Sequence, residues 1–169
     1  MITFKKLVFS ASQTQETNAY TADVYWHGRK IGTIRNDGNG GMSHLYPSGP
    51  EARADIQDAT NHAKEQVVIV SVTPGEKYQY LEDYIDDLAL LDSHKTRVER
   101  WVKRSVKNRV VVIVDGEVRT SIKANPNLAL SAIKDAMRRK YPAGTIVNDL
   151  AVDDAVARLT QCRGFTLSE

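Results

Sequence analysis

The feature that most constrains the fold is an Asp-Gly pair between two β-rich runs. Asp115-Gly116 separates residues 109–114 from residues 117–122, and Asp-Gly is a preferred two-residue hairpin turn because both positions take a positive φ. The first run is continuously apolar, as in a strand covered on both faces. The second run alternates apolar with polar side chains, so one of its faces meets water. We therefore expect an antiparallel hairpin in this half of the chain.

A second hairpin is expected near the N-terminus. Residues 2–10 predict a strand, and residues 20–27 alternate apolar with polar side chains at the period of a half-buried strand. His27-Gly28 can turn the chain so that residues 30–35 return as the partner strand. Gly32 inside this return strand indicates a β-bulge or the close approach of another backbone.

Helices are predicted by capping signals and by the helical spacing of apolar residues. Ser48-Gly49-Pro50-Glu51 combines a Ser cap, a Pro in the first turn and a Glu three residues on, and it predicts a helix to about Lys64. The β-branched run at 67–72 predicts a buried strand. Thr73-Pro74-Gly75-Glu76 is a second capping box, and it predicts a helix that extends to about Lys107, either unbroken or broken at Asp92-Ser93.

The complete pattern predicts an α+β fold, in which antiparallel β-hairpins pack against helices, including one long or broken helix. The elements after the Asp-Gly hairpin are a helix with Ala129, Ile133, Ala136 and Met137 on its inner face, a short strand at 145–147 and a last helix at 150–162. No fixed-period repeat or Pro/Gly/Ser-rich linker interrupts the sequence. We therefore expect a single domain over residues 1–169, with 72/73 as the one position that suggests a division into two layers.

Composition excludes several classes of protein. Hydrophobic residues are 41% and charged residues 26% of the chain, as in globular proteins that bury a core. Cys162 is the only cysteine, so no intrachain disulfide forms and nothing indicates an oxidising compartment. The longest aliphatic runs are too short to span a bilayer, and Lys5 and Lys6 interrupt the apolar start that a signal peptide needs. We expect a cytoplasmic protein without a membrane partner.

Charge is distributed unevenly although the formal net charge is only +2. Residues 76–92 carry six acidic side chains against one lysine, and residues 95–109 carry seven basic side chains against one acid. A basic helical stripe is typical of phosphate contact, of docking on an acidic protein, or of pairing with the acidic segment if the chain folds back. Trp101 falls with the apolar residues, and no exposed aromatic indicates base stacking. The candidate nucleic-acid-binding residues are Arg97, Arg100, Lys103, Arg104, Lys107, Arg138 and Arg139.

The segment Asn36-Asp37-Gly38-Asn39-Gly40-Gly41 offers more residues that accept positive φ than a two-residue turn requires. Clustered backbone N–H groups in such a loop can bind an anion. However, neither the P-loop pattern nor the dinucleotide-binding spacing is present. The candidate ligand- or partner-binding residues in and beside this loop are Asn36, Asp37, Asn39, His44 and Tyr46.

This region also carries a resemblance. Tyr25-Trp26-His27-Gly28-Arg29-Lys30-Ile31-Gly32, followed by residues 36–41, resembles small uncharacterised proteins of bacteriophages and other mobile elements, in which an aromatic, Lys-Ile-Gly and Asn-Asp-Gly-x-Gly-Gly stretch is found. The resemblance implies a small accessory protein that acts on host machinery. It implies no catalytic residue.

No motif assigns catalysis, a metal or a cofactor. The four histidines lack the i, i+4 spacing of a helical zinc site, and Cys162 is typical of a small core residue. Asp115 with Glu117-Val118-Arg119 is similar to a metal-dependent nuclease pattern, but Arg replaces the Lys and the turn already explains Asp115.

Three functions remain open at this point. The leading interpretation is a non-enzymatic binding or regulatory module that inhibits or modulates a host macromolecule, with a protein as partner. One alternative is a nucleic-acid-binding protein that uses the basic helix. The other is a small-ligand or nucleotide-binding protein, or a hydrolase, built at the Gly-rich loop.

Overall fold

The computed structural model describes residues 1–68, 76–125 and 127–162. The chain divides into two compact units, Met1–Ser93 (unit 1) and His94–Glu169 (unit 2). The boundary lies inside a helix, α2 (Leu81–Ser105), and not near 72/73. The sequence shows no linker because the connection is helical. Each unit has its own core among the described residues.

Helix α2 is continuous, so the unbroken helix is the one of the two alternatives that the structure shows. Buried Ala89 and Val98 lie on either side of Asp92-Ser93, and Asp and Ser are tolerated inside a helix whose apolar face packs. The helix also begins later than expected, because residues 76–80 are not helical. Residues 73–75 of the expected capping box, and residues 69–72 of the expected buried strand, lie outside the described residues.

Unit 1 is built on a four-stranded antiparallel sheet in the order β1-β2-β3-β4. Its strands are β1 (Ile2–Phe9), β2 (Tyr20–Trp26), β3 (Arg29–Asn36) and β4 (His44–Pro47). Val24 pairs with Gly32 while the next residue pairs with Lys30, so Ile31 is the extra residue of a β-bulge. A Cβ on Gly32 would lie 2.4 Å from the Tyr46 carbonyl oxygen. Both expectations for Gly32 are confirmed, and the close approach brings β4 against β3.

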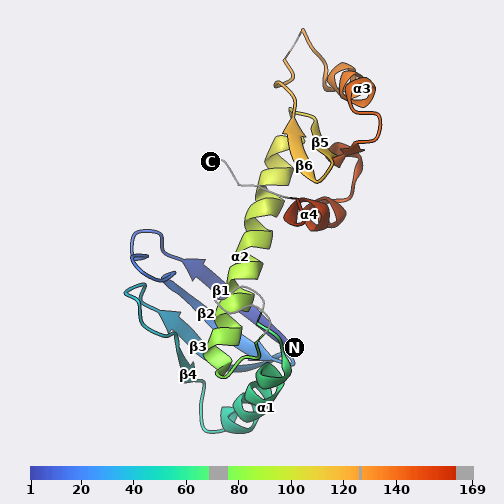
Figure 1. Cartoon of the computed structure of the whole chain (residues 1–169). Helices are drawn as coiled ribbons and strands as arrows, with labels where there is room; N and C mark the ends of the chain where they lie inside the picture. Colours follow the sequence, from blue (N-terminus) through green and yellow to red (C-terminus); the bar gives the residue numbers. More distant parts are fainter. Residues whose placement is uncertain (69–75, 126, 163–169) are drawn as a thin grey trace. The chain divides into compact units, whose positions relative to one another are not determined.

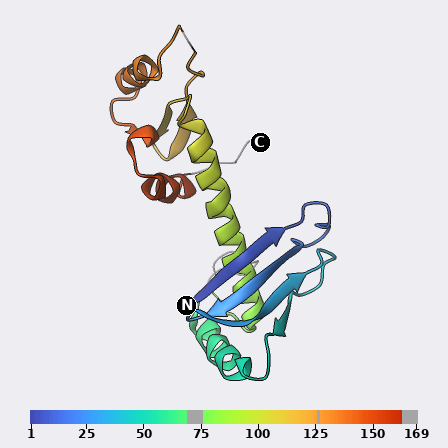
Figure 2. The ribbon, with the colours of Figure 1, turned by 180° about the vertical axis from the view of Figure 1, so that it is seen from behind.

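One face of this sheet is covered by α1 (Ala52–Glu65) and by the first turns of α2, and Figure 2 shows the face that they leave open. The core between them contains Val24, Ile31 and Ile34 from the sheet and Ile85 from α2, all fully buried. The expected Ser cap of α1 is wrong. Ser48 Oγ donates to the Lys30 carbonyl oxygen instead, and the helix starts after Glu51 without a side-chain cap.

Unit 2 contains the predicted Asp-Gly hairpin. The strands β5 (Val111–Val114) and β6 (Glu117–Thr120) are antiparallel, and Asp115 and Gly116 take φ values of 52° and 77°. A short strand, β7 (Thr145–Ile146), pairs with the other edge of β5. Helix α3 (Leu130–Lys140), a 3₁₀ turn η1 (Val147–Asp149) and α4 (Val152–Thr160) complete the unit (Figure 1).

Strand β5 is apolar on both sides because it separates two clusters of side chains. Val111 packs with Val98 and Val102 of α2 and with Leu159 of α4. Val110 and Val112 face the opposite way and pack with Ile133 of α3. Beside Ile133, α3 contributes Leu130 and Met137, whereas the predicted inner residues Ala129 and Ala136 are exposed.

The α+β fold class is thus confirmed, with antiparallel sheets and one long helix. Within residues 1–68, 76–125 and 127–162, no helix combines the length and the apolar character needed to cross a bilayer.

Candidate nucleic-acid interface

The two units carry opposite formal charge. Unit 1 contains eight Lys and Arg against thirteen Asp and Glu, a net charge of −5. Unit 2 contains fifteen Lys and Arg against eight Asp and Glu, a net charge of +7. A charge of this size on a small unit attracts polyanions and accelerates their association. The basic unit is therefore the place to look for a site that binds phosphate.

A cationic stripe (Arg97, Arg100, Arg104 and Lys107) runs along the part of α2 in unit 2 and into the turn that follows the helix, where Lys107 lies. Its members follow one another at i+3 or i+4, so neighbouring side chains project from one side of the helix. All four are exposed, whereas Val98 and Val102 on the other side are 0% and 2% exposed. Packing of the apolar side against β5 and α4 thus fixes which side the stripe presents.

Of the other three predicted phosphate-binding cations, two form ion pairs within unit 2 and one is exposed on helix α3. Lys103 forms an ion pair with Glu99 one turn earlier. Arg138 forms ion pairs with Asp135 and Asp149, at 3.2 and 2.9 Å. Arg139 is exposed on α3. By contrast, the four members of the cationic stripe form no ion pair with any described residue.

A cavity of about 350 Å³ opens beside the cationic stripe. The described residues of its wall are three cations, one half-buried aromatic side chain and three uncharged polar side chains, with no carboxylate among them. These residues, the cationic pocket, are Trp101, Arg104, Ser105, Asn108, Arg109, Thr120 and Lys123. Arg104 belongs to the pocket and to the stripe, so the two form one continuous basic surface within unit 2.

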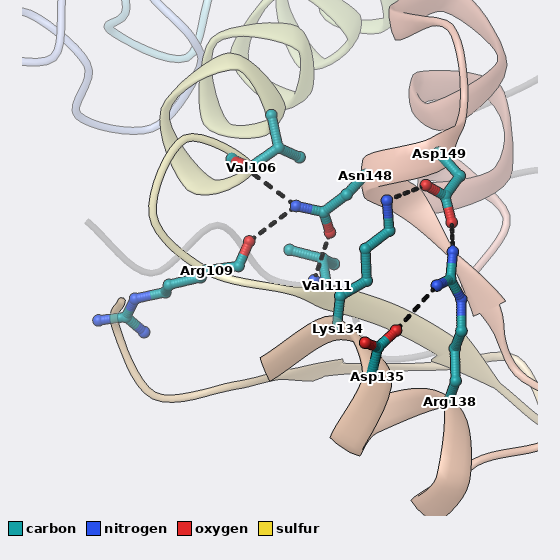
Figure 3. A network of polar contacts seen from close by, with 8 residues as sticks. All are labelled: Val106, Arg109, Val111, Lys134, Asp135, Arg138, Asn148 and Asp149. Carbon is teal, nitrogen blue, oxygen red and sulfur yellow. Dashed lines mark hydrogen bonds and ion pairs between the residues drawn. The ribbon is translucent and has the colours of Figure 1, made fainter. Parts of the chain in front are cut away.

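Hydrogen bonds fix the chain where α2 turns into β5, which is one wall of the cationic pocket. The Asn148 amide nitrogen donates to the carbonyl oxygens of Val106 and Arg109, at 3.2 and 2.8 Å (Figure 3). The Asn148 amide oxygen accepts from the Val111 N–H, at 2.9 Å. One side chain therefore satisfies two carbonyls and one N–H of the segment that joins α2 to β5. The position of Arg109 depends on this contact.

The wall of the pocket that contains Lys123 is fixed by hydrogen bonds from residues that follow β6. The Ala124 N–H donates to the Asn108 carbonyl oxygen at 2.6 Å, and the Ser121 N–H donates to the Val110 carbonyl oxygen at 2.8 Å. These bonds place Lys123 next to the end of α2. Cations are also favoured there by the partial negative charge of a helix C-terminus.

Asp149, the last residue of η1, holds helix α3 through two of its cations. It accepts from Lys134 and from Arg138, as the dashed lines in Figure 3 show. The hydrogen bond from Lys134 and that from Arg138 hold the pKa of Asp149 below its usual range. Arg138, a predicted phosphate ligand, therefore has a structural contact within unit 2.

The Gly-rich loop in unit 1 is held by Asn36, which is only 7% exposed. Its amide oxygen accepts from the Gly38 N–H and from the Thr17 hydroxyl, at 2.8 and 2.9 Å. Its amide nitrogen donates to the Gly41 carbonyl oxygen and to Ser43 Oγ, at 3.2 and 3.1 Å. The loop is thus organised around a buried polar side chain, and Asn36 lies away from the surface at which a partner would bind.

The remaining loop candidates lie on the surface of unit 1. Asp37 forms an ion pair with Arg35 at 2.6 Å, and Asn39 is exposed. His44 pairs with Arg35 in the sheet, and Tyr46 pairs with Thr33, so both belong to the fourth strand. The loop N–H of Gly38 is already bonded to Asn36 and that of Gly40 to Thr17. These bonds use N–H groups that an anion-binding loop would need.

Sequence reasoning did not predict the cationic pocket. Of its residues only Arg104 was a candidate, and those that were missed are Trp101, Ser105, Asn108, Arg109, Thr120 and Lys123. Two signals point to it. Trp101 stands four residues after Arg97 and three before Arg104, so it borders the stripe as well as the core. In the hairpin, Val111 pairs with Thr120, and continuing this register brings residues 109 and 122 together.

The described part of the chain contains no group of three or more His, Cys, Asp or Glu placed to hold a metal ion. Comparison of the chain with protein-family models, with curated proteins and with solved structures gave no match. The argument about function therefore rests on the geometry and the charge of the site.

Proposed function

We propose that this protein is a non-enzymatic module that binds nucleic acid through unit 2. The observation that carries the proposal is the continuous basic surface formed by the cationic stripe and the cationic pocket. The four stripe residues form no ion pair with a described residue, and the described part of the pocket wall contains no carboxylate. Such a surface matches an array of phosphates, whose condensed counterions are released on binding.

The continuity of α2 removes one competing explanation. The cationic stripe would be neutralised internally if the acidic segment folded back on it at Asp92-Ser93. The helix is unbroken over Leu81–Ser105, so no turn at Asp92-Ser93 folds the acidic segment back. Two of the acidic side chains accept hydrogen bonds inside unit 1 instead: Asp86 from Tyr20 and Asp87 from Tyr78.

Nucleic acid is favoured over an acidic protein by the composition of the surface. Arginine supplies three of the four stripe positions, and its planar group binds phosphate through two hydrogen bonds. A tryptophan lies among the cations, and aromatic side chains in basic grooves are typical of nucleic-acid-binding proteins. The wider interpretation, a regulatory accessory protein of the cytoplasm, accommodates this partner. A protein partner remains the competing outcome of the test.

The test is a salt series of affinity for nucleic acid, measured by fluorescence anisotropy on the full chain. We expect the logarithm of the association constant to fall linearly with the logarithm of salt concentration. Arg100→Glu with Arg104→Glu should abolish binding at about 0.15 M salt, because it replaces two phosphate ligands by repelling charges. The fold should persist, since both side chains are exposed.

The matched control is Arg53→Glu with Lys64→Glu on α1. It makes the same change of charge at two exposed positions of unit 1. We expect it to lower affinity far less than the unit 2 pair. Equal effects of the two pairs, or binding that does not depend on salt, would contradict the proposal and favour a protein partner.

A further inference from the structure

We propose that the cationic pocket binds a phosphate monoester, the terminal phosphate of a nucleic-acid strand, while the cationic stripe binds the phosphodiesters next to it. The inference deepens the proposed function and rests on it. It starts from a difference within the basic surface of unit 2. The stripe supplies one cation at each step along α2, whereas the pocket gathers three cations around one hollow.

The three cations of the pocket come from three different segments of unit 2. Arg104 lies on α2, Arg109 lies between α2 and β5, and Lys123 follows β6. None of them forms an ion pair with a described residue. Like charges that face one hollow repel one another. An anion that carries more than one negative charge therefore stabilises this arrangement.

Hydrogen bonds of the backbone fix the segments that carry these cations. The Val110 N–H donates to Ser121 Oγ at 2.8 Å, and the Ser121 N–H donates to the Val110 carbonyl oxygen at 2.8 Å. The Asn148 amide holds the Arg109 carbonyl oxygen at 2.8 Å (Figure 3). Binding an anion therefore orders only side chains on a backbone that is already in place, which lowers the entropic cost of binding.

The end of α2 opposes an anion less than a bare helix end does. The C-terminus of a helix carries a partial negative charge on its last carbonyl groups. Here the Ser105 carbonyl oxygen accepts from the Arg109 N–H at 3.0 Å. The Asn108 carbonyl oxygen accepts from the Ala124 N–H at 2.6 Å. These bonds offset part of the negative charge, and the three cations of the pocket outweigh the rest.

The chemistry of the wall matches a monoester better than a diester. A monoester carries a charge of about −1.5 to −2 at pH 7 and three strongly accepting oxygens, whereas an internal phosphate of a strand carries a single charge. The guanidinium groups of Arg104 and Arg109 can each donate two hydrogen bonds to phosphate oxygens, and Lys123 adds a third charge. The uncharged donors of the wall are the hydroxyl and amide groups of Ser105, Asn108 and Thr120.

The cationic stripe favours a strand end over a free phosphate ion. Arg104 belongs to the pocket, and Arg100 and Arg97 precede it on the same side of α2. Each step advances about 5 Å along the helix axis. One cation at each step suits the single charge of each phosphodiester. A strand with its terminal phosphate in the pocket thus reaches the arginines of the stripe with the phosphates that follow.

The test uses the full chain and short strands of one sequence, each labelled at an internal base so that both ends stay free. One strand has a 5′-phosphate, one has a 3′-phosphate, and one has hydroxyl groups at both ends. We expect one of the phosphorylated strands to bind at least about tenfold more tightly than the hydroxyl-ended strand, because the monoester gains charge-assisted hydrogen bonds. Inorganic phosphate should bind more weakly than that strand, since it does not reach the stripe.

A hydroxyl-ended strand that is two nucleotides longer is the matched control for charge. Its two additional phosphodiesters give it about the same total negative charge as the phosphorylated strand. It has no monoester, so we expect its affinity to stay close to that of the shorter hydroxyl-ended strand.

Two variants that each remove one positive charge separate the pocket from the stripe. Lys123→Gln changes the pocket wall, and Lys107→Gln changes the stripe outside the pocket; both side chains are exposed. We expect Lys123→Gln to weaken the phosphorylated strand more than the hydroxyl-ended strand. Lys107→Gln should weaken both strands by the same factor.

The outcomes distinguish the inference from the proposed function. If phosphorylated and hydroxyl-ended strands bind equally and with salt dependence, or if the longer strand binds as tightly as the phosphorylated one, the inference is overturned and the proposed function stands. Inorganic phosphate bound as tightly as the phosphorylated strand also overturns the inference, because the pocket is then a site for a free anion. The same loss of preference in both variants would remove the pocket as the site. If no strand binds, the inference and the proposed function are both wrong.

Discussion

Two buried carboxyl groups of unit 1 and two ion-paired carboxyl groups of unit 2 are held in opposite ways. In unit 1, burial raises the pKa of Asp83 and of Asp86, so their negative charge opposes folding. In unit 2, hydrogen bonds from Lys103 and Lys134 lower the pKa of Glu99 and of Asp149, so their charge supports it. Three of these four carboxyls lie on α2, which shows that one helix provides both environments.

The comparison extends to the surfaces that the two units present. In unit 1, Asp86 and Asp87 accept hydrogen bonds from tyrosines of the same unit, and burial next to Asp86 raises the pKa of Tyr20 far above its ordinary value. In unit 2, Glu99, Asp135 and Asp149 form ion pairs with some of the cations, and the cationic stripe has no ion pair with the residues that the structure describes. The unpaired charge is costly by self-repulsion, which is expected of a surface that binds a polyanion.

The largest expected effect comes from removing the asparagine that organises each unit. Asn36→Ala and Asn148→Ala each leave several backbone or side-chain partners without a hydrogen bond. We expect each to lower the free energy of unfolding by on the order of 3 kcal/mol, measured by urea denaturation. Only Asn148→Ala should also weaken nucleic-acid binding, because Asn148 fixes the wall that carries Arg109.

Serine variants sharpen this comparison, since Ser keeps one hydrogen-bonding atom and should recover part of the stability. If Asn36→Ala weakens nucleic-acid binding as much as Asn148→Ala under conditions in which both variants are folded, the binding function is not confined to unit 2.

A smaller effect is expected from pH. A carboxyl with a raised pKa costs stability when it is ionised, so unit 1 gains stability as pH falls from neutral through the raised pKa values of Asp83 and Asp86. The contribution of Asp149 is fully present above the ordinary aspartate pKa. It is lost only as pH falls through its lowered value. Mild acid should therefore stabilise unit 1 and leave unit 2 unchanged.

Residue-resolved amide hydrogen exchange measures the two responses separately. Asp86→Asn keeps an acceptor for Tyr20 and should reduce the gain of unit 1 in mild acid. Asp92→Asn, an exposed carboxyl of the same helix, is the control. If the amides of unit 2 lose protection from exchange between neutral pH and mild acid, the ion pairs of Glu99 and Asp149 do not stabilise unit 2 as we expect.

Local sequence signals predicted most of the fold. The Asp115-Gly116 hairpin, the bulge at Gly32 and the helical character of α2 each depend on residues close together in the chain. The start of α2 was wrong because a capping box is a local pattern, and here residues 76–80 run outside the helix before it begins. The boundary between the units falls inside a helix, so no linker marks it in the sequence.

The candidate site was predicted only in its local part. The cationic stripe follows from helical spacing alone. The pocket also needs Arg109, Thr120 and Lys123, whose positions depend on how the hairpin meets the end of α2. Asn36 was expected to bind a partner because buried and exposed asparagines look alike in a sequence. Only the three-dimensional structure shows that its four hydrogen bonds are internal.

The smallest expected effects concern the exposed loop candidates of unit 1. The ion pair of Asp37 with Arg35 is more than 60% exposed on both sides, and such pairs contribute less than about 1 kcal/mol because water and salt screen them. Asp37→Ala, Asn39→Ala and His44→Ala should therefore leave the melting temperature nearly unchanged. They should also leave nucleic-acid affinity unchanged, since none belongs to unit 2. The measurement is thermal unfolding beside fluorescence anisotropy for each variant. A loss of affinity without a loss of stability would add the loop to the interface, and the functional division between the two units would then be wrong.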